Sequence, residues 1–139
     1  MNIKTINVAL SQIGTKEIVG KNHNPEVLKY FKEIGHKWVT TDETAWCSAF
    51  VNWVCKQSDK PYTKKLNARS WLKIGQKTEC PEIGDIVVFW RGKPDSWKGH
   101  VAFFIRETKT HVYVLGGNQN NEVNITAYPK SKLLEYRTL

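Results

Sequence analysis

Cys47 is the first residue in this sequence whose type and position could do chemistry. It follows a segment rich in helix-capping residues, 40–44, and lies in a run that is apolar on all sides, 45–54. This pattern predicts a centrally buried helix with Cys47 in its opening turn. The unpaired N–H groups and the positive dipole end of a helix start favour a thiolate, the nucleophilic form of cysteine. A lone cysteine in an apolar helix is more commonly an inert core residue, so Cys47 alone is only a candidate.

His100 and Asn118 could complete a catalytic group with Cys47. His100 opens a predicted strand, 100–105, which a short polar segment joins to a second predicted strand, 111–115. In such a hairpin, opposed residues have numbers that sum to about 216–218 and Cβ atoms about 5 Å apart, so Asn118 would lie beside His100. An Asn carbonyl that accepts from one imidazole nitrogen leaves the other for the thiol, which is the Cys-His-Asn arrangement of papain-like enzymes. The alternatives are a structural histidine and a turn asparagine.

Other chemistries have weaker support. The sequence has no His-x-x-x-His or Cys-x-x-Cys spacing, no phosphate-binding loop and no nucleic-acid motif, so we predict neither a metal site nor a cofactor. Tryptophan rings could stack on sugars or bases. Those in strongly apolar segments are predicted to be core residues: Trp46, Trp53 and Trp90. Those nearer polar sequence are candidates for a binding groove: Trp38, Trp71 and Trp97.

The composition describes one folded domain, residues 1–139. A hydrophobic fraction of 40% with six Trp excludes a disordered chain. The apolar run 86–90 is as long as any other and far shorter than the ~20 residues that span a bilayer. The N-terminal residues have no apolar signal-peptide core, so we expect synthesis in a cytoplasm without an export signal. Three cysteines exclude a complete disulfide framework, and we expect free thiols or at most one bridge to Cys80.

The positive charge is concentrated in one stretch, 56–77. The chain has a net charge of +8. The stretch contributes much of it, with Asp59 as its only acidic residue and these basic ones: Lys56, Lys60, Lys64, Lys65, Arg69, Lys73 and Lys77. The ordinary explanation is a solvated face that keeps the protein in solution. The alternative is a docking face for an anionic polymer, such as nucleic acid, a wall polymer or a lipid head-group layer.

Hydrophobic periodicity places helices before strands. Helices are predicted over 6–13, 25–34 and 45–54 and around 67–74, and strands over 85–90, 100–105, 111–115, 123–127 and 133–137. In the second helix, Asn24 is the predicted N-cap and Pro25 the first helical residue. Helices followed by antiparallel strands predict the α+β class.

Four segments resemble CHAP-type and related NlpC-type cysteine peptidases. Residues 44–53 (Thr-Ala-Trp-Cys-Ser-Ala-Phe-Val-Asn-Trp) resemble their nucleophile helix, and 84–89 (Gly-Asp-Ile-Val-Val-Phe) their first core strand. Residues 99–103 (Gly-His-Val-Ala-Phe) resemble the histidine strand, and 116–119 (Gly-Gly-Asn-Gln) the segment with the third polar residue. The order Cys, His, polar residue also matches. One departure is Gly116, where many CHAP domains have Glu.

The resemblance implies a papain-like fold in which the nucleophile helix packs on a C-terminal antiparallel sheet. It implies hydrolysis of an amide bond in bacterial peptidoglycan, as an endopeptidase or an N-acetylmuramoyl-L-alanine amidase. The expected catalytic residues are Cys47, His100 and Asn118, and the expected substrate-binding residues are Asp42, Glu43, Trp46, Trp71 and Gln119. A small, basic chain of this kind looks like a monomeric phage endolysin that is released to the cell wall from the host cytoplasm.

Several other functions stay open at the level of sequence. The fold could serve as a non-catalytic wall-binding or phage structural module, since fold does not fix function. A basic chain could instead bind nucleic acid, with steep salt dependence. The same Cys-His pair could also support a transferase, a deamidase or an amidase that is delivered between bacteria as a toxin.

Overall fold

The helices lie in the first half of the chain, as the apolar periodicity predicts. The computed structural model of the protein describes residues 2–18, 23–38 and 45–139. Its helices are α1 (Ile3–Leu10), α2 (Pro25–Lys32), α3 (Cys47–Gln57) and two 3-10 helices, η1 (Ala68–Lys73) and η2 (Lys130–Lys132). The predicted start of α2 is confirmed: the Asn24 side chain accepts a hydrogen bond from the Glu26 N–H at 2.8 Å, with Pro25 in the first turn. None of the described helices is long and apolar enough to cross a membrane.

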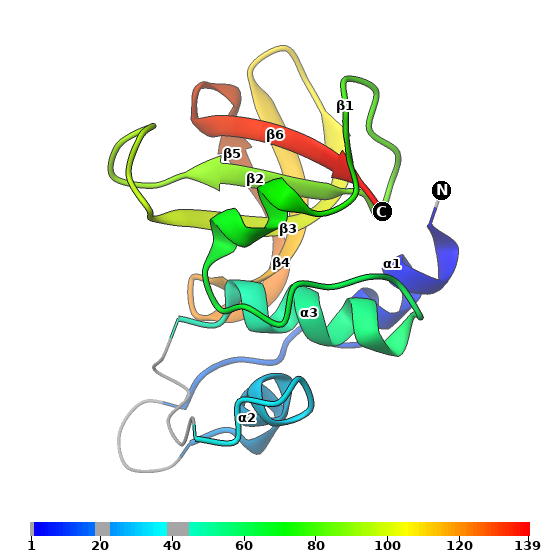
Figure 1. Cartoon of the computed structure of the whole chain (residues 1–139), viewed down its shortest axis with the longest axis vertical. Coiled ribbons are helices and arrows are strands. Elements are labelled where there is room, and N and C mark those ends of the chain that lie inside the picture. The colour runs from blue at the N-terminus through cyan, green and yellow to red at the C-terminus, as the bar shows by residue number, and fades with distance from the viewer. Residues whose placement is uncertain (1, 19–22, 39–44) are drawn as a thin grey trace.

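The strands form one six-stranded sheet. They are β1 (Gln76–Thr78), β2 (Ile86–Trp90), β3 (Gly99–Glu107), β4 (His111–Gln119), β5 (Glu122–Pro129) and β6 (Leu133–Thr138), in the order β1-β6-β2-β3-β4-β5. Every pairing is antiparallel. The structure therefore has the α+β class and the papain-like layering that the sequence predicts, with α3 between the sheet and α2 (Figure 1).

Both faces of the central strands are buried, which explains why these strands are apolar throughout instead of alternating. Val101 and Phe103 of β3 pack with the helices in the main core. Ala102 and Phe104, which point the other way, pack into a second core on the opposite face of the sheet. Alternate side chains of a strand face opposite sides, so a strand covered on both sides needs apolar residues at successive positions.

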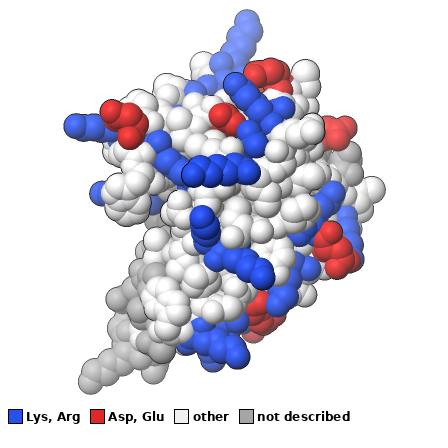
Figure 2. All heavy atoms as spheres, viewed as in Figure 1, with Lys and Arg blue, Asp and Glu red and all other residues white. Residues whose placement is uncertain are grey.

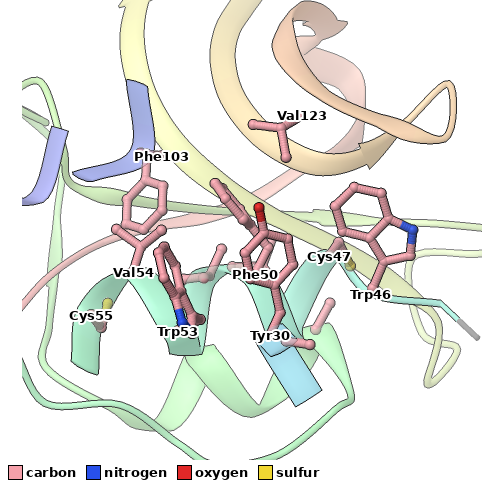
Figure 3. Packing of buried hydrophobic residues seen from close by; sticks show 14 of the residues in the cluster. Tyr30, Trp46, Cys47, Phe50, Trp53, Val54, Cys55, Phe103 and Val123 are labelled. Atoms are coloured by element: carbon pink, nitrogen blue, oxygen red, sulfur yellow. The ribbon is translucent and has the colours of Figure 1, made fainter. Parts of the chain in front are cut away.

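Helix α3 is the centre of the main core. All of its residues from Cys47 to Cys55 are buried. The Tyr30 ring of α2 packs against Phe50 and Trp53, with centroid separations of 5.2 Å in both cases, and lies 5.9 Å from the Trp46 ring (Figure 3). This layered packing holds the first turn of α3 against the ends of β3 and β4, where the candidate site lies.

The structure departs from the sequence prediction in a few elements. The helix predicted around 67–74 is the 3-10 helix η1, and α1 ends at Leu10 instead of 13. Strand β1 was not predicted, because its three residues carry no apolar alternation. The capping segment 40–44 lies outside the described residues, and the N-cap of α3 is Trp46, which makes no side-chain cap bond. All three cysteines are free thiols.

Candidate active site

Cys47 is the first residue of α3 and is 6% exposed. Burial by itself would raise the pKa of its thiol. The hydrogen bond to His100 and the positive charge of that ring, together with hydrogen bonds from the backbone N–H groups of Val101 and Ser48, outweigh burial and lower the pKa below its ordinary value. The helix start thus holds a thiol that ionises readily, which is what a nucleophile requires.

His100 lies at the start of β3, opposite Phe89 of β2, and is 4% exposed. The centroid of its ring lies 5.0 Å from that of Tyr128 and 6.4 Å from that of Phe89, and the Phe89 and Tyr128 centroids are 4.8 Å apart, so the three rings form one cluster. Burial raises the pKa of Tyr128 to about 12, so this phenol stays neutral beside His100. The aromatic contacts fix the plane of the imidazole.

Gln119 is the residue that holds the far side of the imidazole. Its Oε1 lies 2.9 Å from His100 Nε2. The Gln119 amide nitrogen donates to the backbone oxygen of Asn124 at 2.8 Å and to Asn124 Oδ1 at 3.0 Å. Because the Gln119 amide nitrogen donates both of its hydrogen bonds to Asn124, the amide oxygen must face His100. The hydrogen-bond network therefore assigns a proton to His100 Nε2 and leaves Nδ1 for the Cys47 thiol.

The sequence prediction assigned this hydrogen bond to Asn118, and the structure corrects that assignment by one residue. Strand β4 has an irregular register between Gly116 and Gln119. Asn118 sits inside this interval with φ = +58°, a left-handed conformation that asparagine tolerates. A bulge inserts an extra residue and shifts the alternation of side chains that follow it. The Asn118 side chain lines the adjacent hollow, and Gln119 turns inward to His100.

Gly116 makes room for the Gln119 amide. A Cβ atom at position 116 would lie 2.7 Å from Gln119 Oε1 and 2.8 Å from the Ala102 Cβ. Both contacts are too short, so any side chain here would push the amide away from the imidazole. The space beside His100 that a side chain at position 116 would fill is taken by the side chain of Gln119.

Two hollows flank the Cys47 and His100 side chains. The first has a volume of about 260 Å³ and is lined by Phe89, Trp90, Arg91, His100, Asn118, Asn120, Tyr128 and Lys132. The second has about 250 Å³ and is lined by Ala45, Cys47, Leu66, Asn67, Ala68, Arg91, Trp97, Lys98 and Gly99. A ligand that occupied both would pass over the thiol and the imidazole. In the part of the chain that the structure describes, no group of three or more His, Cys, Asp or Glu side chains could hold a metal ion.

Comparison with known proteins identifies the family of this chain. The CHAP domain family model matches residues 39–118, more than half of the chain, and includes Cys47 and His100. This chain belongs to the CHAP family. CHAP domains are peptidoglycan hydrolases and typically depend on a cysteine and a histidine. In this CHAP chain, the missing side chain of Gly116 leaves the space beside it to Gln119.

A solved structure supports the same fold. The CHAP chain superposes on a protein described as similar to a lipoprotein of the NLP/P60 family, from Staphylococcus aureus subsp. aureus Mu50, with a TM-score of 0.56 and 16% identity. The match covers 98% of this chain and 40% of the other, so the chain spans less than half of that protein's length. At this identity the likeness concerns the fold alone. No curated protein matches the chain.

Two of the predicted substrate-binding residues are core residues in this CHAP structure. Trp46 and Trp71 are each 0% exposed. The Trp46 indole N–H donates to Glu17 Oε1 at 2.6 Å, and the Trp71 indole N–H donates to Ser48 Oγ at 3.0 Å. Neither ring faces solvent, so the prediction of substrate contact is wrong for both. The polar sequence around Trp71 is misleading, because residues before it cross over the buried face of α3.

The remaining predicted residues fall into different places. Asp42 and Glu43 lie outside the described residues. Gln119 is 2% exposed and reaches His100 instead of a hollow, so its predicted contact with substrate is replaced by a contact with the imidazole. Trp97 is 74% exposed and lines the second hollow, as its polar surroundings indicate.

The sequence prediction missed Tyr128, Asn124 and Arg91. Tyr128 and Asn124 both lie on β5, which pairs with β4 and so reaches the site only through the sheet. Polar and apolar residues alternate along this strand, but the exposed positions are the apolar Ile125 and Ala127, and nothing in the sequence linked β5 to His100. Arg91 follows a predicted strand directly, and a polar residue at a strand end is the kind of signal that could have drawn attention to it.

The low pKa of Cys47 has a measurable consequence. In a Cys80→Ser background, which removes the exposed thiol, we expect the rate of Cys47 alkylation by iodoacetamide to rise with pH through a midpoint below that of a free cysteine, about 8.5. Burial opposes ionisation of the Cys47 thiol, but the interactions with His100 stabilise the thiolate by more, so the thiolate is already present at the lower pH. Alkylation is measured by mass spectrometry across a pH series.

His100→Ala is the control for this prediction. It removes the interactions that lower the pKa and keeps most of the burial that raises it. The midpoint should then move above that of the parent protein. An unchanged midpoint in His100→Ala would show that the histidine does not stabilise the thiolate.

Proposed function

We propose that this CHAP protein hydrolyses an amide bond of bacterial peptidoglycan, with Cys47 as nucleophile, His100 as acid and base, and Gln119 as the residue that positions His100. The observation that supports it most strongly is the series of contacts from Cys47, at the start of a buried helix, to His100 on β3 and on to Gln119 on β4, beside two open hollows. Nucleophile, base and orienting group within hydrogen-bond reach are the signature of covalent catalysis.

The proposed reaction has two steps. The Cys47 thiolate attacks the amide carbonyl carbon, and the protonated His100 gives its Nδ1 proton to the leaving amine, which leaves a thioester. A water molecule then attacks the thioester carbonyl, with His100 as the base that takes its proton, and the new carboxylate leaves as Cys47 is regenerated. Through both steps the Gln119 Oε1 accepts from His100 Nε2, 2.9 Å away, and stabilises the charged ring.

The backbone of α3 supplies donors for the developing oxyanion. The N–H groups of the first turn of a helix have no partner within the helix. We assign the Cys47 N–H, at the first position of α3, to the negatively charged oxygen of the tetrahedral intermediate. Its position next to the attacking sulfur is what makes the assignment reasonable.

The finer assignment is an endolysin that acts as an endopeptidase or an N-acetylmuramoyl-L-alanine amidase. The family membership and the net charge of +8 support this assignment. We further propose that the protein acts as a monomer, with residues 1–139 forming one domain, and that it is released from a host cytoplasm to the wall. A wall-binding module of the same fold, without chemistry, is the principal competing function.

Digestion of purified peptidoglycan tests this proposal. The protein, kept reduced, is incubated with the polymer, and the soluble fragments are identified by mass spectrometry. Free amino-sugar chains and intact stem peptides would identify an amidase, and cut peptides would identify an endopeptidase. If the folded protein releases nothing, while it still sediments with the polymer, the competing wall-binding function replaces the proposal.

The basic stretch 56–77 is only partly available for docking to an anionic wall. Lys56 donates to the Glu33 backbone oxygen and Lys60 to Asn2 Oδ1, and each of the three Arg69 guanidinium nitrogens donates to a backbone carbonyl. Lys64 and Lys65 are exposed. In the view of Figure 2, Lys and Arg side chains lie across the middle of the molecule, and Asp and Glu side chains are scattered around them.

We expect hydrolysis of peptidoglycan to fall several-fold as NaCl rises from about 0.05 M to about 0.3 M, because salt screens attraction between exposed charges. Lys64→Gln/Lys65→Gln should flatten this dependence. The control is Arg106→Gln/Lys109→Gln, which removes the same charge at the far end of β3 from His100 and should keep the parent's slope. Rates are measured by turbidity. If the Lys64/Lys65 variant keeps the parent's slope, these two residues take no part in docking.

A further inference from the structure

Arg91 is the only residue that lines both hollows of the candidate active site, among the residues that the structure describes. It follows Trp90, the last residue of β2, and its side chain is exposed. Its positive charge acts on Tyr128, whose ring packs on His100. The guanidinium therefore stands beside the reacting centre, where a substrate that spans the two hollows must pass.

Nothing in residues 2–18, 23–38 and 45–139 neutralises this guanidinium. Its side chain makes no hydrogen bond or ion pair with any of them. No described acidic residue lines either hollow. Each hollow is also lined by a lysine, Lys132 in the first and Lys98 in the second. The described walls of the site thus present positive charge to whatever binds there.

A second arginine shows that the arrangement is not a general feature of the surface. The Arg69 guanidinium donates to the backbone oxygens of Lys98, Pro94 and Lys93 at 2.8, 2.9 and 3.0 Å. These bonds hold the loop that borders the second hollow. Arg69 therefore has a structural role in this loop, whereas the Arg91 guanidinium has no hydrogen-bond partner among the described residues and is available to a ligand.

The backbone of Arg91 is held in place by the same loop. Its N–H donates to the Lys98 backbone oxygen at 3.3 Å, and its own backbone oxygen accepts from Ser96 Oγ at 2.9 Å. A charged side chain on a fixed base loses less freedom when it binds than one on a loose loop.

We propose that Arg91 binds a carboxylate of the substrate peptide, close to the amide bond that is cut; this deepens the proposed function and rests on it. The planar guanidinium matches a carboxylate in two parallel hydrogen bonds. The hollows beside Cys47 and His100 hold the groups on either side of the scissile amide, so an anion bound there belongs to the substrate itself. Substrates in which a neutral carboxamide replaces the carboxylate that binds Arg91 are cut more slowly than those that carry the carboxylate.

The test compares two forms of one peptidoglycan. Both are first stripped of covalently attached phosphate polymers, and one is then treated to convert its carboxylates to carboxamides. We expect the parent protein to digest the carboxylate form about tenfold faster at low substrate concentration, as the loss of one charge-assisted pair predicts. Arg91→Gln should bring the two rates within about twofold of each other, by slowing digestion of the carboxylate form. Arg91→Lys, which keeps the charge without the paired geometry, should fall between them.

Lys109→Gln is the control for lost charge, because Lys109 lies in the exposed β3–β4 turn, and it should keep the parent's preference. Thermal melting checks that Arg91→Gln is folded.

Equal rates of the parent protein on both forms of the polymer, or an equal slowing of both digestions by Arg91→Gln, would overturn the carboxylate site and leave the proposed hydrolase function in place. An Arg91 effect seen only before the phosphate polymers are stripped would assign the residue to phosphate and also overturn it. No digestion of either form by folded parent protein would overturn the proposed function together with this inference.

Discussion

Cys47→Ala is expected to abolish hydrolysis of peptidoglycan, with a fall in kcat/KM on the order of 10⁴–10⁶-fold, as removal of a catalytic nucleophile produces elsewhere. The covalent intermediate needs the Cys47 sulfur, and no other thiol lies near His100, since Cys55 is buried further along α3 and Cys80 is exposed after β1. The variant should still sediment with the polymer, because alanine leaves the two hollows open. Release of soluble fragments and sedimentation are measured on the same samples.

Cys80→Ser is the matched control, since it removes a thiol from the surface and should leave hydrolysis unchanged. Cys55 is unsuitable as a nucleophile because burial raises its pKa to about 12. Equal release by the parent protein and Cys47→Ala would remove Cys47 from the mechanism.

Gln119→Leu is expected to lower kcat about 100-fold, in the upper range found for residues that orient another functional group. Leucine keeps the volume and removes the acceptor that lies 2.9 Å from His100 Nε2. The charged imidazole then loses its partner, so the pH midpoint for Cys47 alkylation should rise as well. That shift separates a positioning role from a merely structural one, which would change stability without moving the midpoint.

Asn118→Gly is the matched control for Gln119→Leu. Glycine adopts the left-handed backbone of position 118 without strain and removes the neighbouring amide. The pH midpoint for Cys47 alkylation should stay at the parent's value, because the Gln119 acceptor of His100 Nε2 is intact, and kcat should fall far less than in Gln119→Leu even though Asn118 lines the first hollow. Asn124→Leu should give an intermediate loss, because Asn124 holds the nitrogen end of the Gln119 amide. A large loss in Asn118→Gly together with normal activity in Gln119→Leu would restore the assignment made from sequence.

Local patterns were enough to predict the elements that carry the site. The run of apolar residues around Cys47 predicts a buried helix, because it leaves no polar face for solvent. The Asn24 cap and Pro25 predict the start of α2. The strand that carries His100 follows from its continuous apolar residues. Periodicity, capping and turn chemistry depend on neighbours in the chain, so they can be recognised without knowing the fold.

The residue that hydrogen-bonds to His100 could not be predicted from such local patterns. Hairpin arithmetic brought the segment after Gly116 to His100, but the choice between Asn118 and Gln119 depended on an irregularity in β4 and on where the amide nitrogen finds acceptors on β5. A one-residue change of register moves a side chain to the other face of a strand, and no local pattern records it.

Local sequence also fails to predict which side chains are buried and which charged groups are engaged within the fold. The ring of Trp71 and the guanidinium of Arg69 both lie in the basic stretch, yet one is a core residue and the other secures a loop. The sequence established a cysteine at the start of a buried helix, a histidine strand and an α+β order, because each of these is encoded in short segments. The assignment of Gln119 to the imidazole and of Arg91 to the open hollows belongs to the tertiary structure, because only the folded sheet brings these residues, which are distant in the chain, to His100 and Cys47.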